Sequence, residues 1–173
     1  MMVSFRNPIL KTKRAKIFIM KKALKWIGII LLIAFIIIQF FPKNYPENQP
    51  VTENDIITHH NVSDDIASIL KTSCYDCHSN QTTYPWYSKI APVSFLLKHD
   101  IEEGRGELNF SEWGTYDVMD KIDKLDELVE ETQEGKMPLP IYTFMHGHAK
   151  LSDSQKEQIE VWANSLMEEI ISE

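Results

Sequence analysis

A run of sixteen uncharged residues, positions 26–41, constrains the folding of this 173-residue chain more than any other feature. Buried in a small domain, such a helix would need polar groups along its length, and only Gln39 supplies one. As a helix the run measures about 24 Å, slightly short of a ~30 Å hydrocarbon core, and snorkelling lysines at its ends can cover the deficit. The run therefore predicts a transmembrane anchor over residues 23–41.

The charges on either side of this run differ in sign. Residues 1–25 hold eight basic side chains and no acidic one, which leaves ten basic against 25 acidic residues in the remainder, a balance of −15. By the positive-inside rule, residues 1–22 form a basic cytoplasmic segment. The chain is then a single-pass protein of the cytoplasmic (inner) membrane with its C-terminal domain in the periplasm. The acidic balance leaves nucleic acid out of the expected partners.

Two alternatives concern the start of the chain. A cleaved signal peptide would show small residues in an Ala-x-Ala arrangement after the apolar run, whereas bulky residues follow it here, so a retained anchor is favoured. Met20, followed by two lysines, also resembles a natural start, so the first residue is either Met1 or Met20.

The remainder divides into a linker and a helical domain. Prolines at 42, 46 and 50 with mostly polar residues between them predict an extended, solvated linker over 42–60. Residues 61–173 show helical periodicity and no strand alternation, which predicts an all-α, cytochrome c-like domain. We expect one helix after a Ser63 cap, a second from Pro92 to Gly104, a third between Asp117 and Glu134, and a last one after a capping box that begins at Ser152.

The chemistry of the chain is concentrated in the sequence Cys74-Tyr-Asp-Cys77-His78. This Cys-x-x-Cys-His pattern is typical of covalent c-type haem attachment, in which two thiols bind the vinyl groups and the histidine becomes an axial iron ligand. Such attachment takes place on the outer side of the bacterial inner membrane, which agrees with the predicted topology. Two alternatives are a redox disulfide, which belongs near a βαβ pattern that is not seen, and a zinc site completed by His146 or His148.

A second axial ligand is expected from a loop methionine. Met137 follows the helix-ending Gly135 and precedes Pro138, so its backbone is stiffened and its sulfur can face iron without disrupting a helix. Met145, His146 and His148, in the next loop, are the competing candidates.

The sequence resembles the bacterial haem-binding domain family, whose members are small, membrane-anchored c-type cytochromes. The resemblance rests on residues 73–80, 83–88 and 90–92, on Asn109 to Trp113 and on Lys136 to Pro138, and it extends over roughly residues 60–170. It implies that haem c is bound through Cys74, Cys77 and His78, with Met137 as the distal ligand.

Five further side chains are candidates for contact with the cofactor. Aromatic residues with one polar atom can lie on a porphyrin edge and hydrogen-bond a propionate, and an arginine can bind a propionate with its fork of donors; these residues are Tyr84, Trp86, Tyr87, Trp113 and Arg105. The proximal imidazole needs a partner for its second N–H, for which carbonyls near Pro85 or Pro92 are expected.

These features predict a monohaem c-type cytochrome that transfers single electrons, an electron carrier rather than a catalyst, although the enzyme question stays open. Its acidic surface predicts a redox partner protein with a basic patch. The alternatives are a haem-based ligand sensor or peroxidase-like enzyme with an open distal site, and a zinc or disulfide binding module.

Overall fold

The computed structural model describes residues 8–172, with side chains from Phe18 onward. The described residues are helical and contain no strand, which confirms the all-α prediction. They form two units, one ending at residue 42 and including 90–92, the other made of 43–89 and 93 onward. The elements in chain order are α1 (Pro8–Ile38), α2 (Ile56–His59), α3 (Asp64–Ser73), α4 (Tyr75–His78), η1 (Trp86–Lys89), α5 (Val93–Glu107), η2 (Phe110–Thr115), α6 (Val118–Gln133), α7 (Pro140–Met145), η3 (Gly147–Ala149) and α8 (Asp153–Ser172).

The first unit contains α1, which overlaps the predicted transmembrane anchor, residues 23–41, but does not confirm it. The helix ends at Ile38, three residues before the apolar run does. After Lys25 only residues 26–38 remain in the helix, about 20 Å, against a hydrocarbon core of ~30 Å. Within the described part of the chain, no helix has both the length and the apolar character needed to cross a membrane. Part of the predicted basic segment, residues 1–7, lies outside the described residues.

The sequence predicts a solvated linker over residues 42–60, whereas residues 43–60 belong to the second unit and are hydrogen-bonded within it. Asn48 makes two hydrogen bonds to the backbone of Thr82, one through each side-chain atom, at 2.8 and 3.0 Å. The Tyr45 hydroxyl contacts the carbonyl oxygens of Ser88 and Ser94, each at 2.8 Å. Ile56 is fully buried in the core. The unit that contains Cys74, Cys77 and His78 therefore begins before residue 61.

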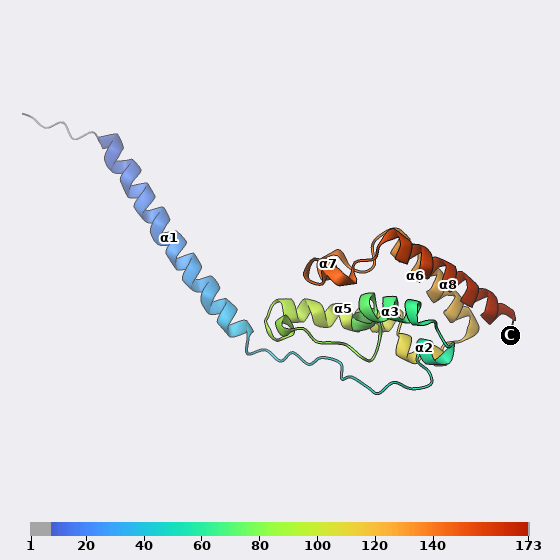
Figure 1. Cartoon of the computed structure of the whole chain (residues 1–173). Helices are drawn as coiled ribbons and strands as arrows, with labels where there is room; N and C mark the ends of the chain where they lie inside the picture. The colour runs from blue at the N-terminus through green and yellow to red at the C-terminus, as the bar shows by residue number, and fades with distance from the viewer. Residues whose placement is uncertain (1–7, 173) are drawn as a thin grey trace, which may run out of the picture. The chain divides into compact units, whose positions relative to one another are not determined.

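The C-terminal half confirms two predicted helices and the caps that begin them. Asp117 caps α6 by accepting the Asp120 N–H at 2.9 Å, and Gly135 follows the helix with a φ of 73°. Ser152 and Gln155 form the predicted capping box before α8. Figure 1 shows α6 and α8 side by side, where Leu125, Ile159 and Leu166 join the buried core.

The first half shows smaller differences from the expected helices. Ser63 holds the N-cap position of α3, but its side chain makes no capping hydrogen bond. The second predicted helix does not stop at Gly104: α5 runs on to Glu107, and Gly104 is buried inside it. A Cβ atom at Gly104 would lie 2.9 Å from the carbonyl oxygen of Cys77, so glycine lets α5 approach α4 closely.

Candidate functional site

The two cysteines are presented by the single helical turn of α4. Cys74 ends α3 and caps α4, and its carbonyl oxygen accepts the N–H groups of Cys77 and His78 at 3.1 and 2.9 Å. One turn separates the two thiols, and both are free. Burial raises the pKa of each thiol to about 12, so both remain protonated at neutral pH.

His78 is oriented by the carbonyl group of Leu108, just beyond the C-terminus of α5. Its Nδ1–H donates to that oxygen at 3.0 Å, so the expectation of carbonyls near Pro85 or Pro92 is corrected. The carbonyl is available because helix C-termini leave such groups without intrahelical partners. Burial lowers the pKa of His78, which favours the neutral ring. With Nδ1 protonated, Nε2 keeps a lone pair for a metal.

His78 and Met137 line the same cavity, which has a volume of about 550 Å³. Helices α5 and α6 supply most of its wall, and Leu108, Leu128 and Leu139 are its apolar members. A smaller void of about 30 Å³ joins Cys74 to His78 and Met137. The structure thus brings together one imidazole, one thioether and one of the two thiols, although they are up to 63 positions apart in the sequence.

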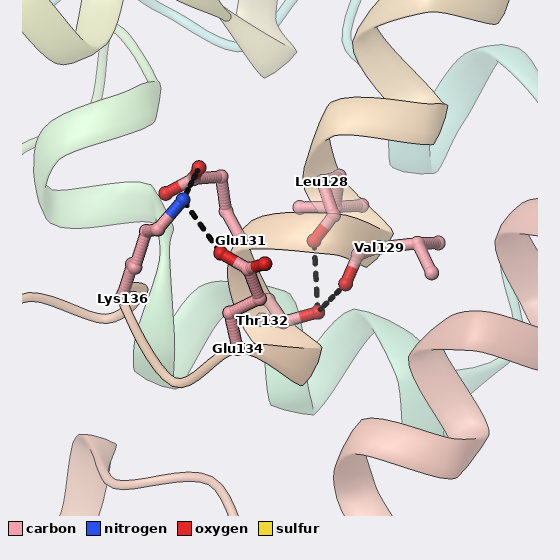
Figure 2. Close-up of polar contacts among 6 residues, drawn as sticks. All are labelled: Leu128, Val129, Glu131, Thr132, Glu134 and Lys136. Carbon is pink, nitrogen blue, oxygen red and sulfur yellow. Dashed lines mark hydrogen bonds and ion pairs between the residues drawn. The ribbon is translucent and has the colours of Figure 1, made fainter.

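The end of α6 fixes the backbone that leads to Met137. Figure 2 shows Lys136 in ion pairs with Glu131 at 3.0 Å and Glu134 at 2.6 Å, beside Thr132, whose hydroxyl contacts carbonyl oxygens of the same helix. The carbonyl oxygen of Glu131 accepts the N–H groups of both Lys136 and Met137 at 3.0 Å. Met137 is half-buried. Its backbone hydrogen bond to Glu131 fixes the place on the cavity wall from which its side chain extends.

The five other predicted cofactor contacts do not line this cavity. The Tyr84 hydroxyl binds the Pro46 carbonyl, Trp86 is 72% exposed, and Trp113 is fully buried in the core. Arg105 donates to the Thr82 hydroxyl at 3.0 Å, and Tyr87 is hydrogen-bonded to His146 at 2.7 Å.

The competing distal ligands also lie outside the cavity lining. Met145 ends α7, and His146 and His148 follow it near one another, with 5.7 Å between their ring centroids. His146 already contacts Tyr87 through Nε2. Among the candidates for the second ligand, Met137 is the one that shares a cavity with His78.

The acidic rim of the cavity and the position of Leu139 were not predicted from the sequence. Helices α5 and α6 both contribute acidic residues to the same opening. Together they are Asp100, Glu103, Glu107, Glu127, Glu130 and Glu131, with Lys124 among them.

A zinc site is not supported by this geometry. Within the described residues, no three side chains of His, Cys, Asp or Glu are close enough to hold a metal ion together. Zinc in structural sites takes four such ligands, so the zinc binding module suggested by the cysteines lacks a ligand set here.

The donor set fits a haem: a neutral imidazole held at Nδ1, a thioether on the same cavity, and two thiols one helical turn apart. No curated protein matches this chain, and no solved structure does so either. The sequence model of the haem-binding domain family matches residues 33–165. The chain belongs to the haem-binding domain family.

Proposed function

We propose that the chain is a monohaem c-type cytochrome that transfers single electrons, in which Cys74 and Cys77 would hold the haem covalently and His78 and Met137 would bind its iron. The observation that supports this most is that His78 and Met137 line one cavity next to the cysteine-bearing turn. Bound haem supplies an iron that alternates between the ferric and ferrous states, and a His/Met ligand pair gives it a relatively high potential.

Each residue has a separate task in this proposal. The Leu108 carbonyl keeps the proton of His78 on Nδ1 and fixes the plane of the ring. The hydrogen bonds to Glu131 hold the backbone of Met137. The two cysteines tie the cofactor to α4, so a domain of this size needs no extensive enclosing pocket.

The acidic rim supports a protein partner with a basic patch. Six carboxylates and one lysine surround the cavity opening, so the local charge is strongly negative there. Opposite charges around a redox centre increase the rate of encounter and orient the partner. We place the domain in the compartment outside the cytoplasmic membrane, because thioether attachment of haem takes place there.

The distal ligand is tested by replacing Met137 with alanine in the haem-loaded protein. We expect the thioether-to-iron charge-transfer band of the ferric protein to disappear, because a methyl group cannot bind iron. Met119→Ala is the matched control, since Met119 is 65% exposed on α6 and does not line the cavity. If the band persists in Met137→Ala, Met137 is not the iron ligand and another residue must take that role.

Ligand binding separates electron transfer from the sensor or peroxidase alternative. With both axial positions filled by the chain, carbon monoxide should bind the ferrous wild-type protein slowly and Met137→Ala quickly. Rapid binding by the wild type at neutral pH would contradict the electron-transfer proposal, because it would show an open distal position.

A further inference from the structure

Asp76, one of the two residues between the cysteines, uses both carboxylate oxygens in hydrogen bonds. Its Oδ2 accepts the Tyr142 hydroxyl at 2.6 Å, and its Oδ1 accepts the backbone N–H of Thr83 at 2.8 Å. Tyr142 lies on α7, 66 positions further along the chain. The turn that carries the cysteines is therefore bonded directly to the helix that follows Met137.

Burial of apolar side chains does not fix α7, because none of its residues is buried. Polar and aromatic contacts take that role. The Tyr142 ring stacks on His146, with centroids 4.4 Å apart and planes 8° from parallel, and His146 is hydrogen-bonded to Tyr87 at 2.7 Å. Burial and the neighbouring Asp76 raise the pKa of Tyr142, so its phenol stays a donor.

Met137 lies between two points at which its segment is attached. On the N-terminal side, the Glu131 carbonyl holds the Met137 N–H. On the C-terminal side, Leu139 is the N-cap of α7, and its carbonyl oxygen accepts the N–H groups of Tyr142 and Thr143 at 2.9 and 3.0 Å. Releasing Tyr142 from Asp76 would remove the direct bond between α7 and the cysteine-bearing turn, and would leave the C-terminal side held by the Tyr142–His146 stacking and the His146–Tyr87 hydrogen bond.

We propose that Asp76 and Tyr142 are positioning residues that hold Met137 at the distal face of the cofactor. The Asp76–Tyr142 bond joins the proximal turn to the distal segment, so the two axial ligands are kept at a fixed separation. This inference rests on the proposed function, because it needs Met137 as the iron ligand. A hydrogen bond to a carboxylate is stronger than one between neutral groups, which suits it to this role.

The test is Tyr142→Phe in the haem-loaded full chain, which removes one hydroxyl and keeps the ring. We expect a weaker thioether-to-iron band and an affinity of the ferric protein for imidazole that is about tenfold higher, since the lost bond no longer opposes displacement of Met137. Backbone hydrogen exchange over residues 138–146 should become faster. The control is Tyr45→Phe, which removes a phenol that hydrogen-bonds elsewhere in the domain and should leave all three readouts unchanged.

Asp76→Asn provides a second route to the same bond if Tyr142→Phe fails to take up haem. Asp76→Asn removes the charge that strengthens the bond, and Tyr142→Phe removes its donor. The double variant should therefore bind imidazole no more tightly than the tighter-binding single variant, because both substitutions act on the same interaction. If Tyr142→Phe keeps the wild-type band, imidazole affinity and hydrogen-exchange rates, the positioning role is overturned and the proposed function is left intact. A wild-type protein that lacks the band would instead refute Met137 ligation and, with it, this inference.

Discussion

His60 carries a buried imidazole whose protonation opposes folding. Its side chain is 9% exposed, Nδ1 lies 3.6 Å from a carboxylate oxygen of Glu169, and the ring of His59 is 4.8 Å away. Burial lowers the pKa of His60, His59 and Lys121 lower it further, and Glu169 opposes them. The folded protein therefore binds this proton less readily than the unfolded chain does.

We predict that His60 makes stability depend on pH. Above pH ~6.5 the ring is neutral in both states and its effect is constant. As the pH falls below that value, the unfolded state takes up the proton first, so the free energy of unfolding decreases until the lower, folded-state pKa is passed. In denaturant unfolding, the free energy of unfolding of His60→Phe should decrease less than that of the wild type between about pH 7 and about pH 5, a range that includes the ordinary histidine pKa of ~6.5. His99→Gln, at an exposed site, should keep the wild-type slope; equal slopes for wild type and His60→Phe would refute this role.

Asp55 is a buried carboxylate that joins the N-terminal segment to the cysteine-bearing turn. It is 2% exposed and accepts the Tyr75 hydroxyl and the Ile57 N–H at 2.9 and 3.1 Å. Asp55→Ala leaves these donors without a partner, so we expect a loss of about 2–3 kcal/mol in the free energy of unfolding. Asp126→Ala, on the exposed face of α6, should change it by less than ~0.5 kcal/mol. A similar loss of unfolding free energy in both variants would contradict the idea that the hydrogen bonds of Asp55 stabilise the fold.

At the scale of the helices, two glycines of α5 differ in what surrounds them. A Cβ at Gly104 would lie 2.9 Å from the Cys77 carbonyl oxygen and 3.2 Å from its Cβ, whereas one at Gly106 would meet nothing within 4 Å. We predict that Gly104→Ala lowers the free energy of unfolding by about 1–3 kcal/mol and reduces the yield of haem-loaded protein, because α5 must move away from α4.

The neighbouring glycine supplies the control for this prediction. Gly106→Ala should leave the free energy of unfolding unchanged or raise it by up to ~1 kcal/mol, since alanine favours the helix and has space. Denaturant titration of the two variants measures the difference. Equal stability of Gly104→Ala and Gly106→Ala would show that α4 and α5 do not need their close approach.

Helices with local signals were predictable from the sequence. An apolar stripe and a cap define α6 and α8, because those signals lie within a few residues of each helix end. The short α7 has no buried residue, and its apolar side chains, Ile141, Phe144 and Met145, are exposed although they have helical spacing. Residues 43–60 are held by bonds to partners such as Thr82, which no local pattern reveals. The apolar run gave a helix, but its end at Ile38 was not visible from composition.

The candidate site was predictable where its sequence signals are local. The Cys-x-x-Cys-His pattern and the Met-Pro pair are local, and the structure brings His78 and Met137 to one cavity. Leu108 as the partner of His78 depends on where α5 ends in space, 30 positions away. Aromatic residues such as Trp113 carry no local signal that separates a core role from a cofactor role, and this one lies in the core.

At the scale of the whole molecule, the acidic rim predicts how the protein meets a redox partner. The rate of electron transfer to a basic partner protein should fall as ionic strength rises, because salt screens attraction between exposed charges. The double variant Glu127→Gln/Glu130→Gln should have a slower rate and a shallower salt dependence. Glu157→Gln/Glu168→Gln changes the charge equally on α8, away from the rim, and should keep the wild-type behaviour. If the two double variants had equal effects, the attraction of the partner would depend on net charge and not on the acidic rim.

Covalent haem attachment is the central claim, and one absorption measurement tests it directly. The full chain is produced together with a c-type maturation system, extracted with acidified acetone, and examined in its oxidised and reduced forms. We predict a Soret band that stays with the protein after extraction in the wild type and is lost in the Cys74→Ser/Cys77→Ser variant. A colourless wild-type protein, or a haem that the solvent removes completely, would contradict the claim.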